Sequence, residues 1–96
     1  MNVFVVLVDA MGGEQLVGTS PTHGQALERL SKVTFGANPR VQQVPVLGAQ
    51  PDPKMVYTAE YYERGLDVHF FEAVYGNNEA ARRSVGKDGL VIPREL

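Results

Sequence analysis

Four polar side chains in the second half of the chain are of types that carry out acid–base chemistry or bind small polar ligands. They are Glu60, Tyr62, Asp67 and His69. They flank the dipeptide Arg64-Gly65, which predicts the turn of a β-hairpin. With the turn at this place, Glu60 faces His69 and Tyr62 faces Asp67 across two antiparallel strands. A carboxylate that faces an imidazole can orient it as a general base. The alternative role of such a pair is structural, on a partly solvated sheet.

The same face of the predicted sheet is apolar elsewhere. Its apolar side chains are Val3, Val5, Leu7, Leu16 and Phe71. Leu7 and Leu16 form a predicted pair in the first half, at the place that Glu60 and His69 occupy in the second. Two short helices can cover only the opposite face, so we expect a homodimer interface at these residues. A one-residue slip of the hairpin would exchange the two faces, and the prediction therefore depends on register.

Length and composition limit the classes of protein to consider. The chain has 96 residues, 44% of them hydrophobic and 21% charged, which is typical of one small globular domain. It has no cysteine, which excludes disulfides and favours a reducing compartment, so we expect a cytoplasmic protein. The start of the chain lacks a basic leader, and the apolar run at residues 3–8 is too short for a membrane span. We therefore expect no membrane partner.

No motif in the chain points to a cofactor. His23 and His69 do not have the spacing of metal ligands, and Gly12-Gly13 precedes a predicted strand where a phosphate loop needs a helix. We therefore expect neither a metal nor a cofactor. The net charge of −2 argues against a general nucleic-acid binder.

The basic residues late in the chain are Arg82, Arg83, Lys87 and Arg94. We interpret them as a solvated helix end and its surroundings. The alternative is a contact with a nucleic-acid backbone or an acidic partner.

Local signals predict the element order ββαβ twice along the chain. The predicted strands are residues 3–8, 14–19, 41–47, 55–62, 66–75 and 90–93. The first predicted helix starts near residue 22, and the second covers residues 79–85. Thr22 with Gln25 fits a capping box, and Asn77 or Asn78 caps the second helix. Pro45 lacks a backbone donor and is typical of a sheet edge. Residues 48–53 are a stiff, proline-rich connector.

Matching residues in the two ββαβ segments predict an internal repeat, with residues 1–47 and 54–96 as its halves. Val3-Phe4 corresponds to Val56-Tyr57, and Gly12 corresponds to Gly65. The sequence therefore predicts a single α+β domain over residues 1–96. We expect a two-layer sandwich, with a mainly antiparallel sheet and both helices on one face. The architecture is analogous to a ferredoxin-like sandwich with extra strands, an analogy that does not fix function.

Three functional hypotheses follow from these patterns. The first is a non-catalytic protein-binding or adaptor module that acts as a homodimer. The second is a regulatory domain that binds a small molecule at the sheet face or a subunit interface, with Glu60, Tyr62, Asp67 and His69 as the ligand-binding residues. The third is a small enzyme that uses His69, although the sequence contains no recognisable nucleophile–base pair and we name no catalytic residue.

Overall fold

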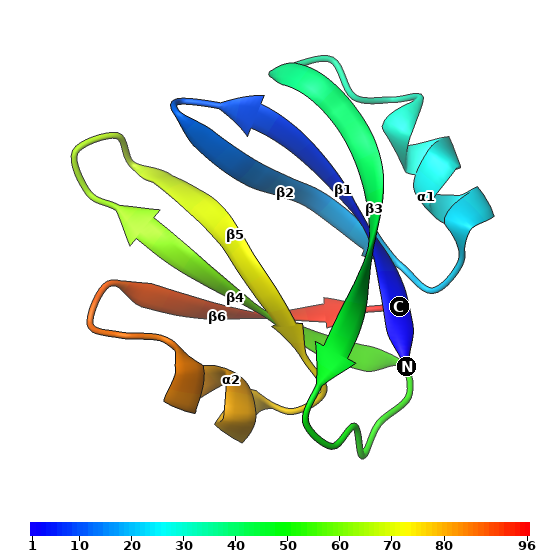
Figure 1. Ribbon diagram of the computed structural model, residues 1–96, viewed down its shortest axis with the longest axis vertical. Helices are drawn as coiled ribbons and strands as arrows, with labels where there is room; N and C mark the ends of the chain where they lie inside the picture. Colours follow the sequence, from blue (N-terminus) through cyan, green and yellow to red (C-terminus); the bar gives the residue numbers. More distant parts are fainter.

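The computed structural model describes the whole chain, residues 1–96, and contains six strands and two helices (Figure 1). They are β1 (Asn2–Ala10), β2 (Gly13–Ser20), α1 (His23–Leu30), β3 (Ala37–Leu47), β4 (Met55–Glu63), β5 (Val68–Tyr75), α2 (Asn78–Ser84) and β6 (Gly89–Glu95). The α+β class and the predicted order of elements are confirmed. The main difference is β3, which begins earlier than expected because its ladder with β1 extends to the pair Asp9↔Ala37.

The six strands form one mixed sheet in the order β2-β1-β3-β5-β4-β6. β1 lies between β2 and β3, β4 lies between β5 and β6, and all four of these pairings are antiparallel. The only parallel pairing joins β3 to β5, and it contains only Val46↔Val74 and Leu47↔Tyr75. The sheet is curled, and its two three-stranded parts join at this short ladder, from which β3 and β5 diverge (Figure 1).

Pro45 explains where the ladder between β3 and β5 stops. The amide of Val46 donates to the carbonyl of Met1, on the β1 side of the strand. Because backbone groups of successive strand residues point to opposite sides, the nitrogen of Pro45 lies on the β5 side. Proline has no hydrogen to donate there, so the edge of β3 is open from Pro45 backwards. The prediction that this strand lies at a sheet edge is wrong, because β3 lies between β1 and β5 in the strand order.

Both helices begin at a side-chain cap. Thr22 Oγ1 accepts a hydrogen bond from the amide of Gln25 at 3.2 Å, and Asn77 Oδ1 accepts one from Ala80 at 2.8 Å. These bonds confirm the caps predicted from sequence, because each satisfies one amide of the first helical turn. Each helix buries a single alanine, Ala26 in α1 and Ala81 in α2. α1 packs against β1, β2 and β3, and α2 packs against β4, β5 and β6.

The apolar core lies inside the curl of the sheet. Its buried side chains are Val3, Val5, Leu7, Val44, Val56 and Val74, and Leu16 and Phe71 pack against them. These include all five residues expected at a homodimer interface: Val3, Val5, Leu7, Leu16 and Phe71. That expectation assumed a flat sheet whose second face needs another chain as cover. The curl instead brings the two three-stranded parts together, and Val3, Val5 and Leu7 are at most 1% exposed within a single chain.

Candidate functional site

The hairpin that carries the predicted site has a different register from the one expected. Glu60 pairs with Phe71 and Tyr62 pairs with His69, so the expected Glu60–His69 and Tyr62–Asp67 pairings are wrong. The turn causes the shift, because it spans the whole segment between Glu63 and Val68, with Asp67 at a positive φ of 54°. A β-bulge between Ala59 and Glu60 changes the register once more, but only for the pairs from Ala59 toward the start of β4.

Three of the four predicted residues nevertheless line one cavity. This polar cleft has a volume of about 310 Å³ and opens between β2 and the β4–β5–β6 part of the sheet. It is lined by Gln15, Leu16, Glu60, Asp67, Val68, His69 and Arg94. Tyr62 is not in the lining but contacts two of its members, as described below. The shift in register preserves this grouping because it moves the pairing by an even number of residues, which keeps Glu60, Tyr62 and His69 on one face.

Glu60 forms the buried wall of the polar cleft. Its side chain is 3% exposed and pairs with Arg94, whose Nη2 lies 3.1 Å from Glu60 Oε2. Thr58 Oγ1 donates to the same oxygen at 2.8 Å. A buried carboxylate is costly unless it is paired and hydrogen-bonded, and Arg94 and Thr58 together meet that need. No hydrogen bond engages Glu60 Oε1, which leaves this oxygen available to a ligand.

Arg94 is a site residue that sequence reasoning placed elsewhere. We grouped it with the basic residues around the second helix, but it crosses from β6 to Glu60 and lines the polar cleft. The register of β6 against β4, with Arg94 opposite Val56, puts its side chain on the same face as Thr58 and Glu60. Arg94 follows the predicted strand 90–93, and no local signal in the sequence indicates its pairing with Glu60.

Tyr62, Asp67 and His69 form the open side of the site. The Tyr62 hydroxyl donates to Asp67 Oδ1. This hydrogen bond, with help from burial and from the negative charge of Asp67, raises the pKa of Tyr62 above its usual value of 10.0. The ring of His69 meets the ring of Tyr62 edge-to-face, with centroids 5.3 Å apart. Neither carboxylate is hydrogen-bonded to His69, so the predicted arrangement in which Glu60 orients an imidazole base is absent.

The polar cleft offers several groups for the recognition of a polar ligand. Glu60 Oε1 and the second oxygen of Asp67 are free acceptors, and Arg94 Nη1 is a free donor. His69 makes no hydrogen bond and can serve as either. No serine, threonine or tyrosine hydroxyl lines the cleft next to a base. No group of three His, Asp or Glu side chains in the chain has the geometry to hold a metal ion.

A second polar cluster joins the far ends of β1, β2 and β3, and sequence reasoning missed it. Arg40 pairs with Glu14 and lies 3.1 Å from Asp9 Oδ1, and Asn38 Nδ2 donates to Asp9 Oδ2 at 3.0 Å. The hydrogen bond from Asn38, followed by the contact with Arg40, lowers the pKa of Asp9 below 3.8. The charged and polar groups of this cluster bond to one another, and we interpret the cluster as structural.

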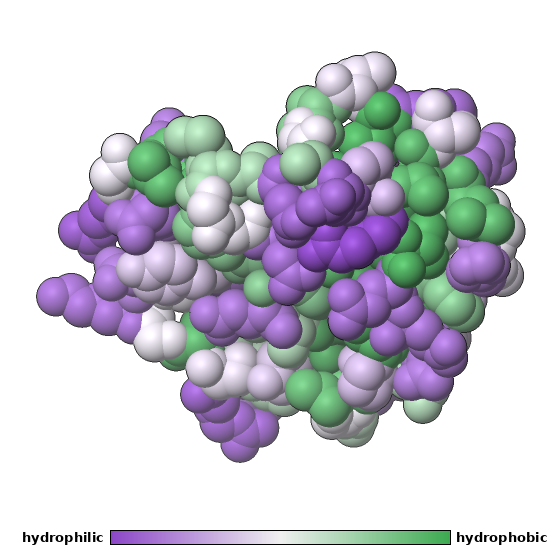
Figure 2. Space-filling view, turned by 45° about the horizontal axis from the view of Figure 1, so that its top comes forward, coloured by the Kyte–Doolittle hydropathy of each residue, from purple (hydrophilic) through white to green (hydrophobic).

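In the space-filling view, hydrophilic residues gather near the centre of the face shown, beside a hydrophobic region on the right (Figure 2).

Comparison with known proteins finds no protein family that matches this chain, no similar curated protein and no similar solved structure. Neither helix is long and apolar enough to cross a membrane.

Proposed function

We propose that the protein is a non-catalytic binding module that takes a small polar ligand in the polar cleft. The observation that carries the proposal is the Glu60–Arg94 pair, in which a buried acid meets a cation at the wall of a cavity. Ion pairs of this kind are weak sources of stability, because burial removes the hydration of both charges. A charged pair inside an otherwise valine-rich core therefore supports a role beyond packing.

The free groups of the cleft define the ligand class. Glu60 Oε1 and Asp67 present negative charge, while Arg94, which pairs with Glu60 Oε2 in the same lining, presents a guanidinium donor. A small molecule with both an ammonium and a carboxylate group complements this arrangement, with the ammonium on the acids and the carboxylate on Arg94. A volume of about 310 Å³ is at the low end for ligand pockets and suits a molecule of amino-acid size.

The test is a thermal-shift screen of the purified chain against free amino acids and related zwitterions. A ligand that binds only the native state raises the melting temperature, and at a hundredfold excess over Kd it adds about 2.7 kcal/mol to stability. Asp67→Asn and His69→Gln should reduce the shift. Glu72→Gln should leave it unchanged, because Glu72 is an exposed acid on the same strand outside the cleft. An absence of stabilisation across the whole panel would remove the proposal.

The second candidate is the predicted homodimer, now placed at a strand edge because the predicted interface residues lie in the core. β2 and β6 are the two edge strands of the sheet. β6 carries Pro93 and two charged residues, which discourage pairing, whereas β2 has no proline and only one charged residue, Glu14. This contrast favours β2 as the edge that pairs with a second copy or with a protein partner.

Light scattering coupled to size-exclusion chromatography tests this candidate. A dimer at tens of micromolar should revert to a monomer in Val17→Lys, because lysine on an exposed edge opposes strand pairing. Met11→Lys, in the exposed turn between β1 and β2, is the matched control and should keep the dimer. A monomer for the unmodified chain at that concentration would rule the candidate out.

We also infer that the two halves are copies of one ββαβ unit. In support, the ladder of β1 with β2 has a bulge between Val6 and Leu7, and that of β4 with β5 has one between Ala59 and Glu60. When Val3-Phe4 is aligned with Val56-Tyr57, these two bulges fall at the same position. Each copy also buries one alanine of its helix, Ala26 in α1 and Ala81 in α2. The polar cleft is then the place where the second copy departs from the first.

A further inference from the structure

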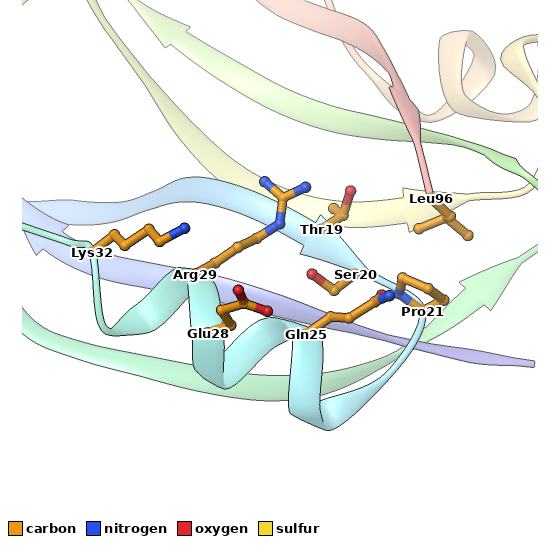
Figure 3. Close-up of a pocket in the computed structure, with 8 residues that line it drawn as sticks. All are labelled: Thr19, Ser20, Pro21, Gln25, Glu28, Arg29, Lys32 and Leu96. Atoms are coloured by element: carbon orange, nitrogen blue, oxygen red, sulfur yellow. The ribbon is translucent and has the colours of Figure 1, made fainter.

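A cavity of about 510 Å³ that the sequence did not indicate lies between α1, the end of β2 and the end of β6. We call it the α1 pocket. It is lined by Thr19, Ser20, Pro21, Gln25, Glu28, Arg29, Lys32 and Leu96 (Figure 3). It shares no residue with the polar cleft, so any ligand there is independent of the proposed function.

Ser20 is a buried hydroxyl without a partner in this pocket. Its side chain is 1% exposed, and Ser20 Oγ is the one buried side-chain polar atom of the chain that makes no hydrogen bond. Leaving such a group unpaired costs free energy, so each exception calls for an explanation. A ligand that accepts or donates a hydrogen bond at this position would supply the missing partner.

Two cations, Arg29 in α1 and Lys32 just after it, extend toward the same space. Figure 3 shows Arg29 reaching across β2 with its guanidinium next to Thr19, and Lys32 extending alongside it. Neither side chain takes part in an ion pair, although the chain has five ion pairs elsewhere. Glu28 is the only acidic side chain in the lining, so the side chains of the pocket carry a net charge of +1 in a chain whose overall charge is −2.

Gly18 makes room for the guanidinium. A Cβ at this position would lie 2.8 Å from Arg29 Nη1 and 3.3 Å from Arg29 Cδ. Gly18 belongs to the middle of a strand, where glycine weakens the sheet and often marks a close approach. Here the approaching group is Arg29, whose side chain lies against the glycine while the residue stays exposed to solvent.

We propose that the α1 pocket binds the phosphoryl group of a small phosphate-bearing molecule. Arg29 and Lys32 supply the positive charge, and the guanidinium can donate two parallel hydrogen bonds to phosphate oxygens. Ser20 Oγ donates a third bond to the phosphate and is no longer unpaired. The volume exceeds that of a phosphate ion, so there is room for the group that carries it. Glu28, at the rim, favours a ligand whose remaining part is neutral or cationic.

NMR amide-shift titrations of the whole chain test the proposal, with inorganic phosphate, a sugar phosphate and the same sugar without phosphate as probes. Saturable shifts at Ser20, Arg29 and Lys32 with either phosphate probe support it. Tighter binding of the sugar phosphate than of inorganic phosphate would show that the carrier group also contributes. Equal binding of the unphosphorylated sugar, or no saturable shift with either phosphate probe, would overturn the proposal.

Variants separate this site from general attraction to basic residues. Arg29→Gln should weaken phosphate binding about tenfold. Ser20→Ala should weaken it less and should not lower the melting temperature of the free chain, because it removes an unpaired polar group. Arg82→Gln on α2 is the matched control and should bind as the unmodified chain does. Equal losses in Arg29→Gln and Arg82→Gln would contradict a defined site.

Discussion

Glu60 and Arg94 carry opposite charges at the edge of an apolar core, and the burial of each charge is offset by its contact with the other. Arg94→Met leaves the Glu60 carboxylate buried with only Thr58 as a partner, which should cost about 2 kcal/mol of unfolding free energy. We expect a cost below the usual range for a fully buried pair, because the Arg94 side chain is 26% exposed. Urea unfolding followed by circular dichroism measures the change.

The double variant Glu60→Leu with Arg94→Met is the informative comparison. It removes both charges and places a leucine where the first half has Leu7. Replacing a buried pair by apolar side chains is often neutral or stabilising, so the double variant should be more stable than Arg94→Met alone. Equal destabilisation by the single and double changes would mean that Arg94 contributes through packing and not through its charge.

The hydroxyl of Tyr62 reports on Asp67 through its pKa. The hydrogen bond to Asp67 raises this pKa above 10.0, so Tyr62 stabilises the fold while it is protonated, below pH 10. The contribution is lost as the pH rises through the raised pKa. In Asp67→Asn the pKa of Tyr62 should fall, and the ultraviolet absorbance of tyrosinate should show one tyrosine titrating earlier. Tyr61, whose pKa is raised mainly by the charge of Glu63, should titrate as before.

At the scale of single residues, sequence predicted the right members of the cleft with the wrong partners. Period-two alternation was enough to put Glu60, Tyr62 and His69 on one face. The pairing depends on a turn that spans the segment between Glu63 and Val68 and includes Asp67 at positive φ, which has no strong local signal. Sequence reasoning did not single out Ser20 or Arg29. Ser20 Oγ lacks a hydrogen-bond partner and Arg29 lacks an ion pair, and such features can be recognised only in the structure.

The two helix caps differ in what they hold, and their removal should differ in cost. Thr22→Ala should cost about 1 kcal/mol, since Thr22 accepts only the amide of Gln25. Asn77→Ala should cost more, because Asn77 Nδ2 also donates to the carbonyl of Ala49 at 2.7 Å. Thr22→Ser keeps the accepting oxygen and is the control. Urea unfolding ranks the three variants, and a larger loss for Thr22→Ala than for Asn77→Ala would contradict this account.

The cluster at the ends of β1 and β3 gives these strands a dependence on acid. Asp9 has a lowered pKa, so it stabilises the fold above its usual value of 3.8 and loses this effect as the pH falls through the lowered pKa. Asn38→Gly removes the main donor and still permits the positive φ of 50° at that position. The pKa of Asp9, measured by NMR titration of its carboxyl group, should rise toward 3.8. An unchanged value would assign the effect to Arg40 alone.

At the scale of elements, local signals were sufficient for existence and order. Thr22 and Asn77 marked both helix starts, and the apolar runs marked β1 and β4. The start of β3 was missed because Asn38-Pro39 is typical of a loop. In the structure, the ladder with β1 extends the strand through both residues to Ala37. Tertiary pairing decides such ends, and a single chain segment does not contain that information.

The path of the whole sheet was beyond what the sequence could predict. A run such as residues 3–8 indicates a strand covered on both faces, and it does not say whether a helix, a second chain or the same sheet provides the cover. The curl settles this point, because Val56 and Val74 from the second half pack with Val3, Val5 and Leu7 from the first. The premise of a dimer through the sheet face disappears with it.

The ladder between β3 and β5 contains only two residue pairs, yet one core extends across it. The two halves are therefore connected more by side-chain packing than by backbone hydrogen bonds. Residues 48–53, which link them, form no helix or strand, and Pro51, Asp52 and Pro53 are exposed. A chain cleaved in this segment should stay assembled as two fragments under native conditions.

Separately produced fragments 1–47 and 54–96 should each be largely unfolded, because neither can bury its valines alone. Mixed together, they should fold as a one-to-one complex, with a gain of β-sheet signal in circular dichroism that saturates at equal concentrations. An independently folded fragment would show that each half has a sufficient core of its own. If the fragments do form a complex, the contact between the halves behaves as a protein–protein interface, and the connector keeps its two sides at a high local concentration.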